Sequence, residues 1–139
     1  MKCLALLAAV SGLWACGVTT DDRPQTLAYI TETILAPNCA TAECHSSTRA
    51  QAGYVFDTVQ HAQDSLADAN DTTGFRSFAA LITVGDPANS PLVTVLNGQG
   101  GYSQSTGKPL MPLDHPLPNK DIFFIGEWIQ NGADGYVAP

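Results

Sequence analysis

A pair of cysteines followed by a histidine limits what this chain can fold into more than any other feature. Cys39 and Cys44 are five positions apart, and His45 follows the second cysteine directly. Such short spacing keeps two thiols and an imidazole close together in any fold. The rest of the chain therefore has to be arranged around whatever these three side chains bind or form.

Three interpretations fit this stretch. A Cys-x-x-Cys-His run is the attachment signature of c-type haem, in which both thiols bond to the porphyrin and the histidine ligates the iron. Here four residues separate the cysteines instead of two. In an exported protein the same pair could form a disulfide bond. The third interpretation is a zinc site of Cys39, Cys44 and His45, although zinc normally has four ligands and no second cysteine pair follows.

Met111 is the candidate for a second iron ligand. The iron of an electron carrier usually takes methionine opposite the histidine, which raises the reduction potential. Residues 16–139 contain this one methionine, inside the proline-dense segment 108–118. The prolines make that segment stiff and non-helical, so it would hold Met111 at a fixed place. His115 and His61 are the alternative ligands.

Residues 1–15 have the pattern of a bacterial export signal. Lys2 precedes a short apolar run, and Leu-Trp-Ala stands directly before Cys16. This resembles the lipobox of bacterial lipoproteins, in which the cysteine becomes the lipidated first residue. We expect a lipidated tether over 16–24, one domain over 25–139, and a place at the bacterial cell envelope, periplasm-facing or at the surface. The apolar run is too short for a transmembrane span.

The charge balance narrows the classes of partner. The chain has 13 Asp and Glu against 6 Lys and Arg, a formal net charge of −7. Nucleic-acid binding needs a basic patch, so no nucleic-acid partner is expected. An acidic carrier would be drawn towards a basic partner protein. We find neither a Ser-His-Asp set nor a convincing carboxylate pair in the sequence, and therefore expect no enzyme activity.

Apolar spacing and capping residues predict a series of helices. Pro37 is expected to stop the first helix, Ser90 to cap the helix that starts at Pro91, and Asn119 to cap the last, which Asn131 and Gly132 end. Residues 53–57 are predicted to be extended. The predicted helices cover residues 24–37, about 58–69, the first part of 75–84, 91–97 and 120–130.

The order of these parts resembles the class I c-type cytochromes, in particular cytochrome-like lipoproteins of environmental bacteria. The resemblance covers residues 27–134. It implies an all-α, small cytochrome c-like fold in which the N-terminal and C-terminal helices cross beside the haem. The matching pieces are the cysteine–histidine run, Val84–Pro87, Ser90–Leu92, Met111–Pro112 and Trp128–Ala133.

The same resemblance assigns the site residues. Cys39 and Cys44 would form the thioether bonds of one covalent haem c, with His45 and Met111 as axial ligands of the iron. The implied function is a monohaem electron-transfer lipoprotein that passes single electrons to a redox partner protein. A haem-free, disulfide-stapled surface lipoprotein acting as a binding or structural module is the alternative. A third, a peroxidase-like or sensor protein, would have an open iron position.

Overall fold

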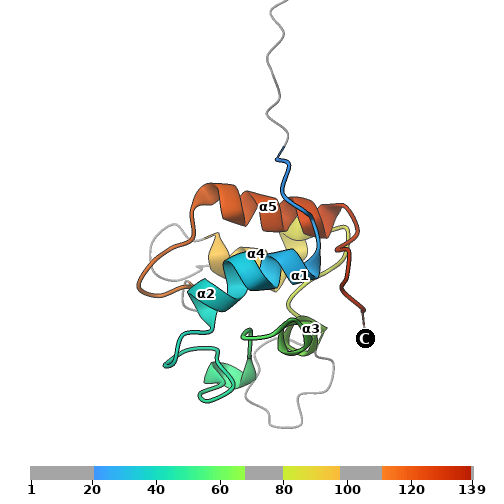
Figure 1. The fold of residues 1–139 in the computed structure, drawn as a ribbon. Helices are drawn as coiled ribbons and strands as arrows, with labels where there is room; N and C mark the ends of the chain where they lie inside the picture. Colours follow the sequence, from blue (N-terminus) through green and yellow to red (C-terminus); the bar gives the residue numbers. More distant parts are fainter. Residues whose placement is uncertain (1–20, 68–79, 98–110, 139) are drawn as a thin grey trace, which may run out of the picture.

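Helices make up the regular structure of the described residues, which are 21–67, 80–97 and 111–138 of this computed structural model (Figure 1). Within these ranges there is no β-strand, which confirms the all-α prediction for this part of the chain. The elements are α1 (Leu27–Ile30), η1 (Thr31–Leu35), α2 (Ala36–Cys39), η2 (Gln51–Gly53), α3 (Val59–Ala67), η3 (Pro87–Asn89), α4 (Pro91–Leu96) and α5 (Asn119–Gln130).

The first three elements form one continuous helix that runs into the cysteine pair. Thr26 caps it by accepting a 3.2 Å hydrogen bond from the N–H of Tyr29. Its middle part, η1, is a π-helix in which the N–H of Ala36 reaches back to the carbonyl of Thr31. The prediction that Pro37 stops the helix is therefore wrong. The wider π-turn shifts the hydrogen-bond register just before the proline, which relieves the clash that its ring would cause in a regular helix.

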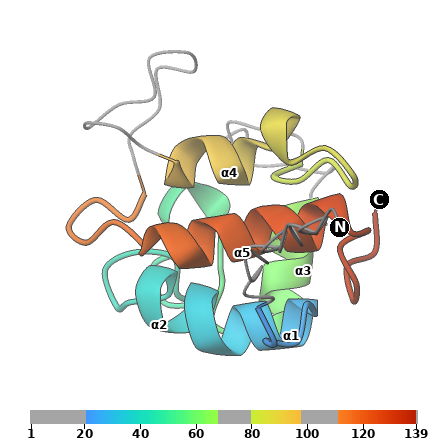
Figure 2. The ribbon, with the colours of Figure 1, turned by 90° about the horizontal axis from the view of Figure 1, so that it is seen from above.

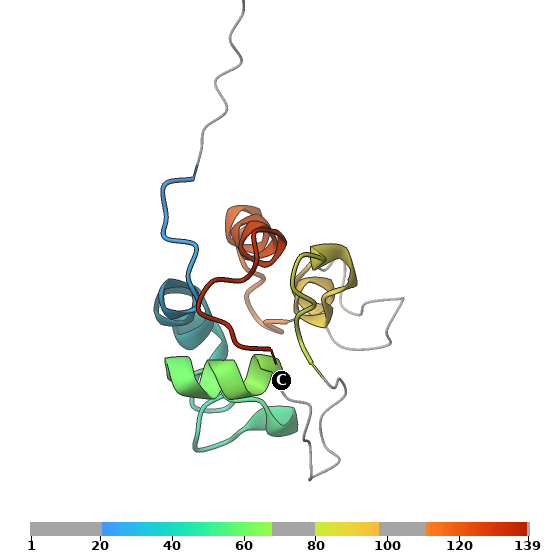
Figure 3. The ribbon, with the colours of Figure 1, turned by 90° about the vertical axis from the view of Figure 1, so that its right-hand side faces the viewer.

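α3 begins where the sequence predicts. The sequence offers Asp57 or Thr58 as the capping residue, and in the structure Thr58 accepts a 3.1 Å hydrogen bond from the N–H of His61. The predicted end near Ala69 lies outside the described residues. Figures 1 and 3 show that α3 runs across the direction of the other long helices.

The helix α4 starts at Pro91, as predicted, but Ser90 does not cap it with its side chain. The Ser90 hydroxyl instead accepts a 2.9 Å hydrogen bond from the N–H of Thr83 and donates one of 2.9 Å to the carbonyl of Asp86. Ser90 thus stabilises the turn before the helix. Residues 80–84 are not helical, because the backbone of Leu81 bridges α3 and α4 through hydrogen bonds to Leu66 and Leu92. The helix predicted over the first part of 75–84 falls on residues 75–79, which lie outside the described ranges.

The last helix, α5, has Pro118 as its N-cap, so the prediction of Asn119 is wrong by one residue. The carbonyl of Pro118 accepts hydrogen bonds from Asp121 and Ile122, which makes Asn119 the first helical residue. Asn131 and Gly132 end the helix as predicted, with Gly132 at a φ of 104°.

The helices enclose one apolar core. In Figures 1 and 2, α5 runs alongside the continuous helix of residues 27–39, in the opposite direction, with α4 on its other side. The carbonyl of Asp134 joins α1 to α5. It accepts one hydrogen bond from the backbone N–H of Leu27 in α1, at 2.9 Å, and one from the indole N–H of Trp128 in α5, at 3.0 Å. The most deeply buried large side chains are Leu27, Ile30, Leu35, Leu66, Phe124, Ile125, Trp128 and Ile129.

The segment 21–26 is held on α5 by Arg23. Its guanidinium forms an ion pair of 2.5 Å with Asp121 and stacks 4.1 Å from the centre of the Phe124 ring. A second ion pair of 2.6 Å joins it to Asp21. Within the described ranges no helix is long and apolar enough to cross a membrane.

Candidate cysteine–histidine site

The two cysteines and the histidine lie within residues 39–45, where α2 ends and a turn follows. Cys39 is the last residue of α2, and the N–H of His45 donates a 2.9 Å hydrogen bond back to its carbonyl. The N–H of Cys44 donates to the carbonyl of Thr41 at 3.0 Å, which tightens the same turn. The structure therefore brings together three of the four residues predicted for the site.

Both cysteines are free thiols, but their surroundings differ. Cys39 is buried and Cys44 is partly exposed. Burial raises the pKa of Cys39 to about 12, with a further contribution from the nearby charge of a Cys44 thiolate. A thiol reacts as the thiolate, so burial makes Cys39 unreactive in the folded domain.

The imidazole of His45 is oriented by its neighbours. Its Nδ1 lies 3.3 Å from the carbonyl oxygen of Tyr54, and the backbone carbonyl of His45 accepts a 2.8 Å bond from the N–H of Phe56. Since a carbonyl only accepts, the Tyr54 contact favours the tautomer with the proton on Nδ1, and the backbone of Gln51 also interacts with this ring. Burial lowers the pKa of His45, which favours the neutral form that binds metals.

Two aromatic rings shield this imidazole. The ring of Phe56 packs edge-on at 5.5 Å and that of Tyr54 at 6.2 Å, measured between ring centres. The two aromatic rings are nearly parallel to each other, with an angle of 7° between their planes. Residues 54–56 thus orient the imidazole by a hydrogen bond and restrict water on the side that they cover.

Asp57 connects the turn that follows the cysteine pair to α3. The sequence indicated only that Asp57 lies just before a helix. One carboxylate oxygen accepts a 2.7 Å bond from the N–H of Ser47, and the other lies 2.5 Å from Nδ1 of His61. The hydrogen bond from His61, followed by those from Ser47, lowers the pKa of Asp57 to about 2. His61, an alternative iron ligand in the sequence, therefore uses Nδ1 to bind Asp57.

Met111 lies in a different segment from the other three site residues. Its side chain is partly buried and packs against the apolar core, and its N–H donates a 2.8 Å bond to the carbonyl of Val95. Figures 1 and 2 show residues 111–118 and residues 40–50 at the same end of the molecule, where α2 ends and α5 begins. His115, the other alternative ligand, is exposed in the same segment.

In the described part of the chain, no group of three or more His, Cys, Asp or Glu side chains is arranged to hold a metal ion. The zinc interpretation of the cysteine pair thus gains no support. Haem does not depend on such a cluster, because the porphyrin supplies four of the iron ligands and the protein only the axial ones.

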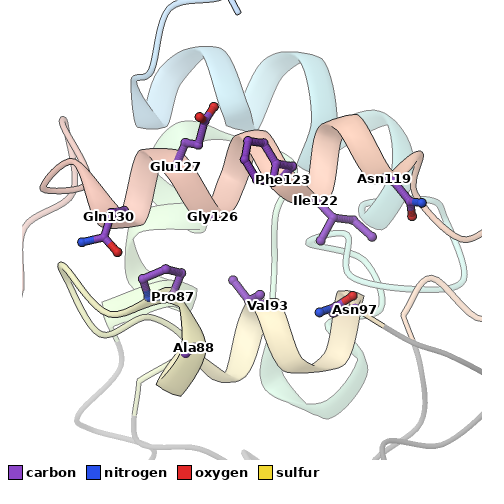
Figure 4. A pocket seen from close by; sticks show the side chains of 10 residues that line it. All are labelled: Pro87, Ala88, Val93, Asn97, Asn119, Ile122, Phe123, Gly126, Glu127 and Gln130. Carbon is purple, nitrogen blue, oxygen red and sulfur yellow. The ribbon is translucent and has the colours of Figure 1, made fainter. Parts of the chain in front are cut away.

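A groove lies apart from the cysteine–histidine turn, between η3–α4 and α5 (Figure 4). Its volume is about 540 Å³. Apolar groups form much of its lining, and Phe123 at its edge is 69% exposed. The lining residues are Pro87, Ala88, Val93, Asn97, Asn119, Ile122, Phe123, Gly126, Glu127 and Gln130.

No protein-family model, curated protein or solved structure matches the chain.

Proposed function

We propose that the protein binds one haem c covalently and carries single electrons at the bacterial envelope, within a cytochrome c-like domain. The observation that carries this proposal is the placement of His45, whose Nδ1 lies 3.3 Å from the Tyr54 carbonyl oxygen and which directly follows Cys44, a free thiol. A hydrogen bond of this kind fixes the tautomer of metal-binding histidines and leaves Nε2 for the metal.

The predicted site residues are of the types that bind haem c. Cys39 and Cys44 would hold the porphyrin through thioether bonds, which need two separate thiols rather than a disulfide. His45 would ligate the iron from one side and Met111 from the other. When bound, haem supplies reversible one-electron chemistry at its iron, and axial methionine raises its potential.

The neighbouring residues would serve this site in separate ways. The carbonyl of Tyr54 holds the imidazole in one orientation and increases its basicity as a ligand. The rings of Tyr54 and Phe56 exclude water from the side of His45 that they cover. Asp57 holds the turn itself, through the N–H of Ser47. All-helical packing of the described residues is compatible with this assignment.

The proposal includes a lipid anchor and a protein partner. Cys16, after its export signal, would carry the lipid and hold the domain at the membrane surface. The net charge of −7 favours association with a basic redox partner.

The visible spectrum tests the haem. The mature protein, expressed in a bacterium with a c-type maturation system, is expected to be red, with sharp α and β bands on reduction. Its intact mass should include one haem that survives acid–acetone extraction. The double variant Cys39→Ser/Cys44→Ser should lose covalent haem. A colourless protein with Cys39 and Cys44 joined in a disulfide would overturn the proposal and support the stapled binding module instead.

Fractionation tests the anchor. Cys16→Ser should move the domain from the membrane to the soluble fraction and abolish labelling by radioactive palmitate. Unchanged membrane association of this variant would contradict lipidation at Cys16.

A further inference from the structure

The point at which the N-terminal segment leaves the domain is fixed. Arg23 pairs with Asp121 in the first turn of α5 and covers the Phe124 ring. The backbone carbonyl of Lys120 accepts a further 3.2 Å bond from the same guanidinium. Gln25 adds a contact of 2.7 Å with Asn131 at the other end of the helix. In Figures 1 and 3, residues 21–26 start above α5 and pass beside it on the way down to α1.

The distance from this point to the proposed lipid is short. Arg23 is seven positions after Cys16, and seven fully extended residues span at most roughly 25 Å. A folded domain of this length is roughly 35 Å across, from the usual scaling of the radius of gyration. The tether is thus shorter than the domain, so a lipid on Cys16 would keep the α5 side near the bilayer.

The surface on that side is suited to a bilayer. Phe123, on α5, exposes 69% of its surface, and the groove beside it opens between α5 and α4. Figures 2 and 4 both look onto this side, with α5 between α1 and α4. Pro87, Val93 and Ile122 give the groove its apolar part, and polar side chains line the rest of it, namely Asn97, Asn119, Glu127 and Gln130. Helices that lie on a membrane bury Trp, Phe and Leu side chains at the boundary between headgroups and acyl chains.

We infer that the α5 side, defined by Phe123 and the groove between α4 and α5, lies against the lipid bilayer with Phe123 in its interfacial region. This inference rests on the lipid anchor of the proposed function. Charge does not drive the contact, because Arg23 is already paired with Asp21 and Asp121, and the groove is lined by the acidic Glu127. The contact should therefore be insensitive to salt.

This orientation places the cysteine–histidine turn on the side away from the membrane. Residues 40–53 lie at the bottom of the molecule in Figures 1 and 3, and α5 lies at the top. A redox partner would thus reach the turn from the aqueous compartment rather than from within the bilayer.

Tryptophan quenching by brominated lipid tests this orientation. Full-length lipidated protein is reconstituted into phosphatidylcholine vesicles with and without bromine on the acyl chains. Phe123→Trp is compared with Val137→Trp, a matched control whose native side chain is 70% exposed in the C-terminal tail, where its backbone bonds to Gln63 of α3. The wild-type signal, which comes from the buried Trp128, is subtracted.

We expect several-fold stronger quenching of Trp at position 123 than at position 137, and added salt should not change this difference. Arg23→Gln should reduce the difference, because it frees the segment that holds α5 near the bilayer. Equal quenching at the two positions would overturn the orientation. So would a Trp at 123 that is shielded from both brominated lipid and aqueous iodide, since a second copy or another protein would then cover the face.

The failure of the anchor is distinguishable from the failure of the orientation. If the wild-type protein did not stay on the vesicles, lipidation at Cys16 would be refuted along with the inference. If the protein stayed on the vesicles through Cys16 but position 123 was not quenched, only the orientation would be wrong.

Discussion

The carboxylate of Asp57 accepts a 2.7 Å hydrogen bond from the backbone N–H of Ser47, ten residues earlier in the chain. This bond fastens the turn that follows the cysteine pair to the start of α3. The other carboxylate oxygen binds His61 in the first turn of α3. The position of the turn thus depends on one ionised side chain.

Asp57→Asn should destabilise the domain by roughly 1 kcal/mol at neutral pH, the usual net value of such a hydrogen bond. The pKa of Asp57 is lowered from 3.8 to about 2, so the native state is favoured by ionisation of this group. Its contribution is fully present above pH 3.8 and is lost as the pH falls towards 2. Urea unfolding of both proteins should show curves that converge in acid; a constant difference at every pH would contradict this role.

Thr31→Val should stabilise the domain by about 1 kcal/mol, because a buried hydroxyl without a partner is replaced by a methyl group. The Thr31 side chain is 1% exposed, and its Oγ1 finds no hydrogen-bond partner among the described residues. Thermal unfolding measures the change. Thr33→Val is the control, since the hydroxyl of Thr33 is exposed and donates a 2.7 Å bond to the carbonyl of Tyr29. A destabilised Thr31→Val protein would mean that this hydroxyl is used.

Two glycine variants should change stability in opposite directions. Gly126→Ala adds a methyl group within ordinary contact distance of Pro87 and should stabilise α5 by about 0.5–1 kcal/mol, the helix preference of alanine. Gly135→Ala should destabilise, because Gly135 has a φ of 79° and the new Cβ would lie 3.3 Å from Leu27. Urea midpoints of the two variants test both signs; stabilisation by Gly135→Ala would contradict the packing of the chain end on α1.

Met111→Ala should lower the reduction potential of the haem-loaded protein and remove the weak long-wavelength band of sulfur-to-iron ligation. The physical reason is that a thioether favours ferrous iron. Leu113→Ala, two residues on and 68% exposed, is the control and should leave both readouts unchanged. If Met111→Ala kept the spectrum and the potential, His115 and then His61 would be the next candidates for the ligand.

Local sequence signals predicted a helix end correctly where the residues at that end determine the structure. The start of α3 at Thr58 and the end of α5 at Gly132 follow from capping and from a residue that accepts positive φ. The short spacing of Cys39 and His45 also places them on one turn, because few residues separate them.

Contacts between distant segments were not predictable from such signals. Pro37 lies inside a helix because a π-turn precedes it, and Ser90 serves Thr83 and Asp86 rather than α4. Asp57 gives no sign in the sequence that it binds Ser47. The spacing between His45 and Met111 likewise does not determine how their segments pack, since α3 and α4 lie between them in the chain.

The packing of α1 against the end of the chain has a consequence for the order of events in the cell. The amide of Leu27 bonds to Asp134, and the ring of Tyr29 packs edge-on against Phe124. The core around α1 therefore cannot close until nearly the whole chain has been synthesised. Cys39 is buried in that core once it has closed. Covalent chemistry at its sulfur must then take place while the chain is still open, or through a local opening of the domain.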